Sequence, residues 1–289
     1  MGSTTRTTRH GALLIDLHFH SNASDGLTSP RDAVIRAGQR GATWVALTDH
    51  DTFDGLKEAG ENAASLGLEW LSGAEFSVWA AGEPVHLLAY GFDTEHEALA
   101  SYVSGFRLDR VRRADEILDR LARHGIRIDR EQLAVHVGAG VFTRPHLAEA
   151  LVREGVVADR VEAFDRFLGD GRPCHVRMPI RDAAETIALV RAAGGITSLA
   201  HPGEWTAHQT LVALARAGMD ALEAWHPSHD GRLTSYYLDL ADRWSLAVTG
   251  GSDDHGRMAM DSGRPVDLPE PRGEVLRERL RGARLRAGR

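Results

Sequence analysis

Histidines and carboxylates lie at the ends of apolar segments throughout this sequence. Seven stretches combine an apolar run typical of a buried β-strand with such a residue: 13–20, 44–50, 70–77, 84–92, 196–201, 220–226 and 246–255. In a parallel barrel the strand ends all open on one face, even where they lie far apart in the sequence. The pattern therefore predicts that these side chains converge, and such a convergence predicts a site for several metal ions.

His18 and His20 are separated by one residue within the first of these stretches. Side chains alternate between the two faces of a strand, so both imidazoles point the same way while Leu17 and Phe19 point the other way. Two histidines placed like this can chelate one divalent ion at ~2.0–2.1 Å each. The H-x-H pattern alone fits a structural role equally well, and it is the candidates downstream that favour the metal interpretation.

Six motifs with candidate ligands follow one another along the chain. They are DLHFHSNASDG, ALTDHD, GAEFS, the lone His86, LAHPG and GSDDHG, and together they span residues 16–256. In this order they resemble the PHP superfamily, which is named for its polymerase and histidinol-phosphatase members. The resemblance covers most of the chain and implies an α/β fold, a distorted seven-stranded (β/α)7 barrel, with up to three metal ions.

The resemblance also assigns nine candidate ligands to three ions, an assignment that the spacing alone does not give. His18, His20, Glu75 and Asp253 would hold the first ion, Asp25, His50 and His255 the second, and Glu75, His86 and His201 the third. Glu75 would therefore bridge two of the ions.

This mixture of histidine and carboxylate ligands suits Mn, Fe or Zn better than Mg or Ca alone, which prefer all-oxygen sites. Manganese is the first expectation, with zinc and iron as alternatives. Several divalent ions in one cleft neutralise phosphate oxygens and lower the pKa of bound water. The predicted chemistry is therefore hydrolysis of a phosphate ester.

Asp25 indicates which subgroup of the family the chain resembles, because many histidinol-phosphatase-like members carry a histidine at this position. The S-D-G form resembles instead a subgroup that includes nucleotide-bisphosphate phosphatases and a small 5′-to-3′ exoribonuclease. Three later stretches also resemble this subgroup: TRPHLAEALVREGVV, AFDRFLGDGRPCHV and ALVRAAGGITSLAHPG. The first expectation is hydrolysis of the 3′-phosphate of a nucleoside 3′,5′-bisphosphate. Trimming of short 5′-phosphorylated RNA, histidinol phosphatase activity and a non-catalytic nucleotide-binding module are the alternatives.

Two further residues are candidates for contacts with the substrate. Arg144 precedes a predicted helix, and a helix start beside an arginine can bind an anion. His226 ends the sixth apolar stretch and would face the same mouth, where it could donate a proton to the leaving oxygen. A surface role for Arg144 and a packing role for His226 are the alternatives. Asp49 and Asp254 are expected to orient metal-binding histidines by hydrogen bonds.

The composition is that of an ordinary globular protein, with 43% hydrophobic and 26% charged residues in a chain of 289. A formal charge of −7 disfavours non-specific binding to duplex DNA, which depends on cations that neutralise phosphates. Cys174 is the only cysteine, and neither a signal-peptide core nor a membrane span is evident. We therefore expect a cytoplasmic protein that acts on a small phosphorylated nucleotide or an RNA 5′ end, without a membrane or an obligate protein partner.

Residues 11–95 and 182–289 are expected to form the barrel, with an inserted helical subdomain at 96–181. Strand patterns alternate with helix patterns in the barrel segments, which implies parallel strands and right-handed crossovers. The arginines of residues 107–120 are interleaved with acidic residues and predict a solvated, salt-bridged helix face. The basic tail, residues 278–289, is expected to fray.

Overall fold

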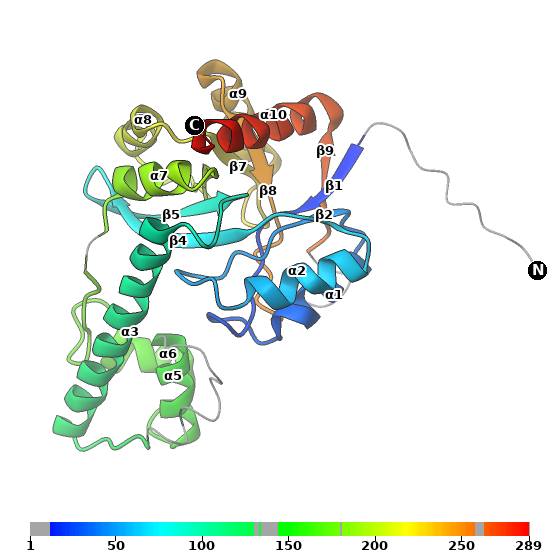
Figure 1. Cartoon of the computed structure of the whole chain (residues 1–289). Helices are drawn as coiled ribbons and strands as arrows, with labels where there is room; N and C mark the ends of the chain where they lie inside the picture. The colour runs from blue at the N-terminus through cyan, green and yellow to red at the C-terminus, as the bar shows by residue number, and fades with distance from the viewer. Residues whose placement is uncertain (1–11, 130–132, 134–143, 180, 258–262, 289) are drawn as a thin grey trace, which may run out of the picture.

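The structure is a computed structural model, and it describes residues 12–129, 133, 144–179, 181–257 and 263–288. The described strands form two sheets (Figure 1). The first has the order β3 (Glu69–Trp70), β2 (Trp44–Val45), β1 (Ala12–Asp16) and β9 (Val266–Pro269). The second has the order β4 (Gly73–Ala80), β5 (Glu83–Tyr90), β6 (Ile196–Leu199), β7 (Ala221–Trp225) and β8 (Ala247–Gly250).

Two seams join these sheets into a closed barrel. At the first seam, His50 lies past the end of β2 and pairs in parallel with Glu75 in β4. At the second, Phe19 lies past the end of β1 and pairs in parallel with Asp254, past the end of β8. Seven strands therefore close the ring, namely β1, β2, β4, β5, β6, β7 and β8. The predicted distorted α/β barrel is confirmed.

β5 departs from the parallel arrangement that the sequence predicted. It is antiparallel to both β4 and β6. Ala81 and Gly82 form the two-residue turn between β4 and β5, and their φ angles of 51° and 84° are both positive, as such hairpin turns require. The start of β5, rather than its end, consequently lies at the face where its neighbours end. His86 is near the start of β5, so it still reaches the common face.

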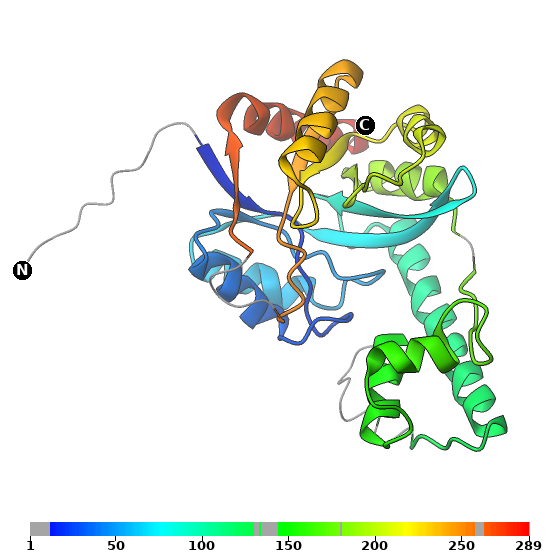
Figure 2. The same ribbon diagram turned by 180° about the vertical axis from the view of Figure 1, so that it is seen from behind.

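The helices of the barrel cover its outer side (Figures 1 and 2). α1 (Pro30–Gln39) and α2 (Leu56–Ser65) pack together beside the first sheet, and α7 (Ala183–Ala192), α8 (His208–Ala217) and α9 (Gly231–Trp244) pack on the second. Ser29 caps α1 as predicted, because its side chain accepts a hydrogen bond from the Asp32 N–H at 3.1 Å. Among the described helices, none combines the length and the hydropathy that crossing a membrane requires.

The basic tail does not fray. It forms the second half of α10 (Glu270–Ala287), in which Leu276, Leu280 and Ala283 are buried against the barrel. The prediction was wrong because these three apolar residues, at helical spacing, are outnumbered by the charged residues around them.

A helical cluster stands beside the barrel. α3 (Glu97–Arg123) runs away from the barrel, and α5 (Arg144–Arg153), α6 (Arg160–Ala163) and the short π-helix η1 (Phe164–Leu168) pack near its far end (Figure 1). Leu99 and Phe106, in the first half of α3, belong to the barrel core. Ile117 and Leu121, in the second half, belong to a separate core shared with α5 and α6. α3 is therefore part of both units.

The arginines of α3 do not form one solvated face. Arg120 pairs with Glu116 at 2.5 Å, one turn away, as predicted. Arg110 pairs instead with Asp51 of the barrel, and Arg113 donates to the backbone carbonyl of Val176 at 2.8 Å. The prediction was wrong for Arg110 and Arg113, because the local charge pattern does not reveal which side of a helix faces the rest of the protein.

Candidate metal centre

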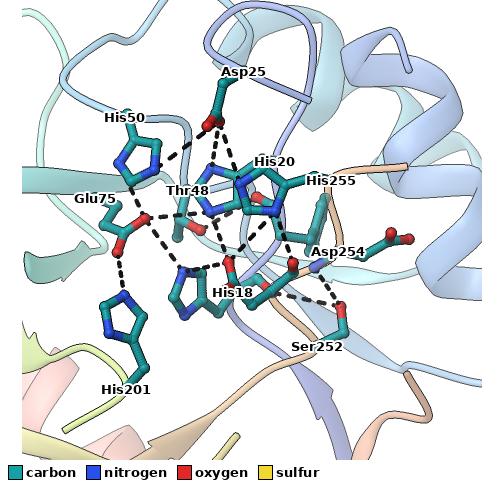
Figure 3. Close-up of polar contacts among 12 residues, drawn as sticks. His18, His20, Asp25, Thr48, His50, Glu75, His201, Ser252, Asp254 and His255 are labelled. Carbon is teal, nitrogen blue, oxygen red and sulfur yellow. Dashed lines mark hydrogen bonds and ion pairs between the residues drawn. The ribbon is translucent and has the colours of Figure 1, made fainter. Parts of the chain in front are cut away.

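The nine candidate ligands come together at one end of the barrel. Figure 3 labels all of them except His86 and Asp253. Most lie just past the ends of parallel strands: His18 and His20 after β1, His50 after β2, His201 after β6, and Asp253 and His255 after β8. Glu75 and His86 lie within the β4–β5 hairpin, and Asp25 lies in the loop before α1. Loops and strand ends of one barrel face thus supply the entire set.

The first ligand set closes around one point. The Nε2 atoms of His18 and His20 lie 3.4 and 3.3 Å from Glu75 Oε2. The same two nitrogens lie 3.4 and 3.2 Å from Asp253 Oδ1. An ion held tetrahedrally by ligands at ~2.0–2.1 Å has neighbouring ligand atoms about 3.3 Å apart. These four separations match four of the six edges of such a tetrahedron.

The second ligand set surrounds Asp25. Its Oδ1 lies 3.3 Å from His255 Nε2 and 4.0 Å from His50 Nε2. His20 Nδ1 is also 4.0 Å from this oxygen, so the His20 ring stands between the first set and the second. One ligand atom from each of these four residues lies within 4.8 Å of all the others, which is close enough to surround one ion.

Glu75 connects the third ligand set to the others. Its Oε1 lies 2.9 Å from both His86 Nδ1 and His201 Nε2, and these two nitrogens are 3.3 Å apart. Its Oε2 faces the other way, toward His18 and His20 and toward His50 Nδ1 at 3.2 Å. Figure 3 shows the carboxylate between His50 and His201. This is the arrangement that a bridging ligand requires.

Several imidazole nitrogens in this centre are buried without a hydrogen-bond partner. They are His18 Nε2, both ring nitrogens of His20, and His50 Nδ1. A buried polar atom without a partner costs about 1–3 kcal/mol, and native proteins rarely leave one. Metal coordination would satisfy one nitrogen of each of these rings, because a neutral imidazole coordinates through the nitrogen that carries no proton. The residues therefore fit divalent ions of the Mn, Fe or Zn type.

Charges within the centre stabilise one another. Burial opposes ionisation of Glu75, but the surrounding histidines, His50 foremost, keep its pKa well below the usual value. Burial also opposes protonation of His20, but Asp253 and Glu75 raise its pKa to about 10. For His50 burial prevails and lowers the pKa to about 4.

Unusual backbone conformations position two of the ligands. His201 and Asp253 have φ angles of 30° and 50°, in the left-handed region that residues with side chains rarely adopt. Surrounding contacts hold these conformations: the His201 N–H donates to Glu223 Oε2 at 2.6 Å, and the Asp253 N–H donates to the His18 carbonyl at 2.7 Å. A Cβ on Gly251 would collide with His18, so the close approach of β8 to β1 requires glycine there.

Glu223, in β7, is a candidate functional residue that the sequence prediction missed. It is fully buried, and its Oε1 lies 2.9 Å from His18 Nδ1. A carboxylate behind a metal-binding histidine fixes the orientation of the ring and raises its basicity. The available signal was a glutamate inside the apolar run DALEAWH, because a buried charge needs a partner.

Asp49 and Asp254 do not orient histidines, contrary to the prediction. Asp49 accepts hydrogen bonds from the Ser21 N–H at 2.8 Å, from Ser21 Oγ at 2.6 Å and from Ser24 Oγ at 2.5 Å. Asp254 forms ion pairs with two arginines at the C-terminal end of α1. Both carboxylates fix the loops that carry the ligands instead of the ligands themselves.

His226 lies beside the first ligand set. Its Nε2 is 3.3 Å from Asp253 Oδ2, and its Nδ1 is 2.7 Å from Ser228 Oγ. The structure thus brings His226 to the metal centre, as the strand-end pattern predicted, with one nitrogen facing the centre and the other engaged by a hydroxyl.

Arg144 lines a pocket of about 170 Å³ beside the centre, together with His50 and His86. Two arginines that the sequence prediction did not single out, Arg110 and Arg113, line the same pocket. We call Arg110, Arg113 and Arg144 the arginine wall. Burial, followed by repulsion from Arg144 and Arg110, lowers the pKa of Arg113 to about 10. An anion in the pocket would relieve this repulsion.

Comparison with known proteins finds relatives of this chain in one family. Residues 16–149 match the model of the PHP domain. A 3′,5′-nucleoside bisphosphate phosphatase of Chromobacterium violaceum is 32% identical over 284 residues, which cover 91% of this chain and 95% of that protein. A 5′-3′ exoribonuclease of Haemophilus influenzae is 36% identical over 264 residues, which cover 88% of this chain and 94% of that protein.

Solved structures give the same result. A crystal structure assigned to a metal-dependent phosphoesterase of Bifidobacterium adolescentis matches this chain with a TM-score of 0.81 at 32% identity. The match covers 92% of this chain and 95% of the other, so it extends over the barrel and the helical cluster alike.

Proposed function

The chain belongs to the PHP family of metal-dependent phosphoesterases, and on this premise we propose that it removes the 3′-phosphate from a nucleoside 3′,5′-bisphosphate. The observation that carries the proposal is the arginine wall, which faces the metal ligands across one pocket. A substrate with two phosphates can place one at the metal ligands and the other against the arginines. The names of the Chromobacterium violaceum and Haemophilus influenzae relatives support a nucleotide or RNA substrate.

The nine ligands, in the three sets above, would hold up to three divalent ions, of which manganese is our first choice and zinc or iron the alternatives. When bound, such ions neutralise the phosphate oxygens and activate a water molecule as the nucleophile near neutral pH. Glu75 keeps the sets at a fixed separation, and Glu223 holds the His18 ring in the orientation that turns its Nε2 toward the centre.

The arginine wall would bind the phosphate that is not cleaved. An arginine presents a planar fork of N–H donors that matches phosphate oxygens, and Arg144 also lies at the start of α5, where the helix dipole favours an anion. His226 would donate a proton from Nε2 to the leaving 3′ oxygen, while Ser228 orients the ring through Nδ1.

Phosphate release from adenosine 3′,5′-bisphosphate by the manganese-loaded protein tests the proposal. We expect AMP and one phosphate per turnover, and no turnover by a His18→Ala/His20→Ala variant. His124→Ala removes an exposed histidine at the end of α3 and serves as the matched control, which should keep full activity. Absence of turnover by the metal-loaded wild-type protein would exclude this substrate.

A second candidate is 5′-to-3′ trimming of short 5′-phosphorylated RNA, the activity named for the Haemophilus influenzae relative. A cleft of about 470 Å³ opens on the other side of His86 and offers room for a longer substrate. Incubation with a 5′-phosphorylated trinucleotide separates the two, since an exoribonuclease releases nucleoside monophosphates one at a time. Asp25 disfavours histidinol phosphate as a substrate, and the complete ligand set disfavours a non-catalytic module.

We also propose the division into a barrel of residues 11–95 and 182–289 and an inserted subdomain of residues 96–181. The two separate apolar cores support it, with the qualification that the first half of α3 packs on the barrel. Cytoplasmic location, together with action independent of membranes, duplex DNA and an obligate protein partner, remains part of the proposal.

A further inference from the structure

Trp205 is more exposed than any other large apolar side chain that the structure describes, with 83% of its surface accessible. It lies in the loop between β6 and α8, four residues after the metal-ligand candidate His201. An exposed indole is costly in water unless something covers it. Because Trp205 lies beside the candidate metal centre, a molecule bound at that centre is a candidate for covering the indole ring.

Hydrogen bonds hold the backbone of the loop that carries the indole ring. The ring lies flat against Gly203, where a Cβ would come within 2.5 Å of the indole Cε2 and Cζ2 atoms. The carbonyl of Gly203 accepts hydrogen bonds from the Tyr237 hydroxyl at 3.0 Å and from the Thr206 N–H at 3.1 Å. The Tyr237 side chain is buried, so the loop is fixed from below while the indole faces solvent. A ligand that binds a ring on a loop held in this way loses little free energy to ordering the loop.

Trp205 forms one side of the cleft of about 470 Å³, a size typical of small-molecule sites. Most of the other lining residues are apolar: Pro84, Val85, Leu199, Ala200 and Pro202. His86 and His201 line the same cleft, and both belong to the third ligand set. His86 also lines the arginine pocket, so the metal centre lies between a basic pocket and an apolar cleft.

We propose that Trp205 is a stacking platform for the nucleobase of the substrate. A nucleobase is a flat ring with apolar faces, and every base can stack on an indole. The ribose would lie near His86, so that its phosphates reach the metal ligands and the arginine wall while the base enters the apolar cleft. This inference rests on the proposed nucleotide substrate and specifies which part of the protein binds the base. It also implies tolerance for different bases, because stacking does not read the base edges.

Steady-state kinetics with two substrates isolate the contribution of the base. We expect Trp205→Ala to raise the KM for adenosine 3′,5′-bisphosphate about tenfold or more, the magnitude typical of base–aromatic stacking. Trp205→Phe keeps an aromatic ring and should stay close to the wild type. An abasic ribose 3,5-bisphosphate should be a poor substrate for the wild type, and neither substitution should change its KM. A tenfold rise in KM for the abasic compound as well would overturn the proposal, because the substitution would then act on the loop and not on the base.

Equilibrium binding tests the same contact without turnover. AMP should quench the indole emission of the manganese-loaded wild type, excited where adenine does not absorb, and the quenching should be lost in Trp205→Phe although AMP still binds. Leu285→Ala, which removes another exposed apolar side chain, on α10, is the matched control. Unchanged quenching in Trp205→Phe would overturn the proposal. Failure of wild-type turnover combined with Trp205-dependent quenching would reject the proposed reaction but retain the base platform.

Discussion

The two walls of the pocket beside the candidate metal centre are built in different ways. The barrel wall consists of histidines and carboxylates on strand extensions, where His18 and His20 have no exposed surface and neighbouring backbone groups are hydrogen-bonded. The wall from the helical cluster consists of long arginines on α3 and α5, and Arg144 retains 30% exposure of its side chain. The buried wall suits chemistry that tolerates little displacement, and the more exposed wall suits selection of a substrate.

The largest effect is expected for Glu75, because the arrangement of all three ligand sets depends on it. Glu75→Gln keeps the volume but removes the charge that faces five histidines, so we expect kcat/KM to fall at least about a thousandfold, the equivalent of several kcal/mol of metal catalysis. Metal content per chain, measured by elemental analysis, should fall in parallel. Activity within tenfold of the wild type would show that the centre does not depend on Glu75.

On the opposite wall, Arg144→Ala should lower kcat/KM for adenosine 3′,5′-bisphosphate by about 10- to 100-fold, the value of a charged hydrogen bond. Metal content should not change, since Arg144 pairs with Asp170 and not with a ligand. Hydrolysis of adenosine 3′-monophosphate, which lacks the second phosphate, should be far less affected. Arg153→Ala, on the last turn of the same helix, is the control. Equal losses on both substrates would contradict a separate phosphate site.

Glu223 supports the barrel wall from behind, and Glu223→Gln should weaken metal binding about tenfold, at the lower end of the range for such partners. The reason is that the amide no longer holds the His18 ring as a carboxylate does. Competition with a chelator of known affinity measures the change. If metal affinity were unchanged while the protein lost stability, Glu223 would be a core residue only.

The smallest effect is expected at the exposed pair on the outer face of α3. Glu116→Gln should change the free energy of unfolding by only about 0.3–0.5 kcal/mol, because exposed pairs one turn apart contribute little. Activity should not change. Urea denaturation measures the stability, and the phosphate-release assay measures the activity. A tenfold loss of activity would mean that the arginine wall extends further along α3 than Arg110 and Arg113.

The two walls also differ in how well their residues could be predicted from the sequence. A histidine or carboxylate after an apolar run is a local signal, and the nine candidate ligands that were located with its help lie together at the barrel end. Glu223 was missed because its partner His18 lies 205 residues away, and only the closed ring brings the two together. Arg110 and Arg113 were missed because their direction depends on how α3 leaves the barrel. The antiparallel direction of β5 follows from the hairpin turn at Ala81 and Gly82. The sequence of this turn did not predict a hairpin.

The seams of the barrel have a consequence for how this protein can evolve. His50 pairs with Glu75 at one seam, and Phe19 pairs with Asp254 at the other, so each seam is formed by ligand candidates or their immediate neighbours. Natural selection that preserves the activity therefore also preserves the closure of the ring. A descendant relieved of selection for catalysis would accumulate changes first where the two sheets meet. Substitutions that moved these backbone segments apart would then weaken the closure of the ring as well as the metal centre.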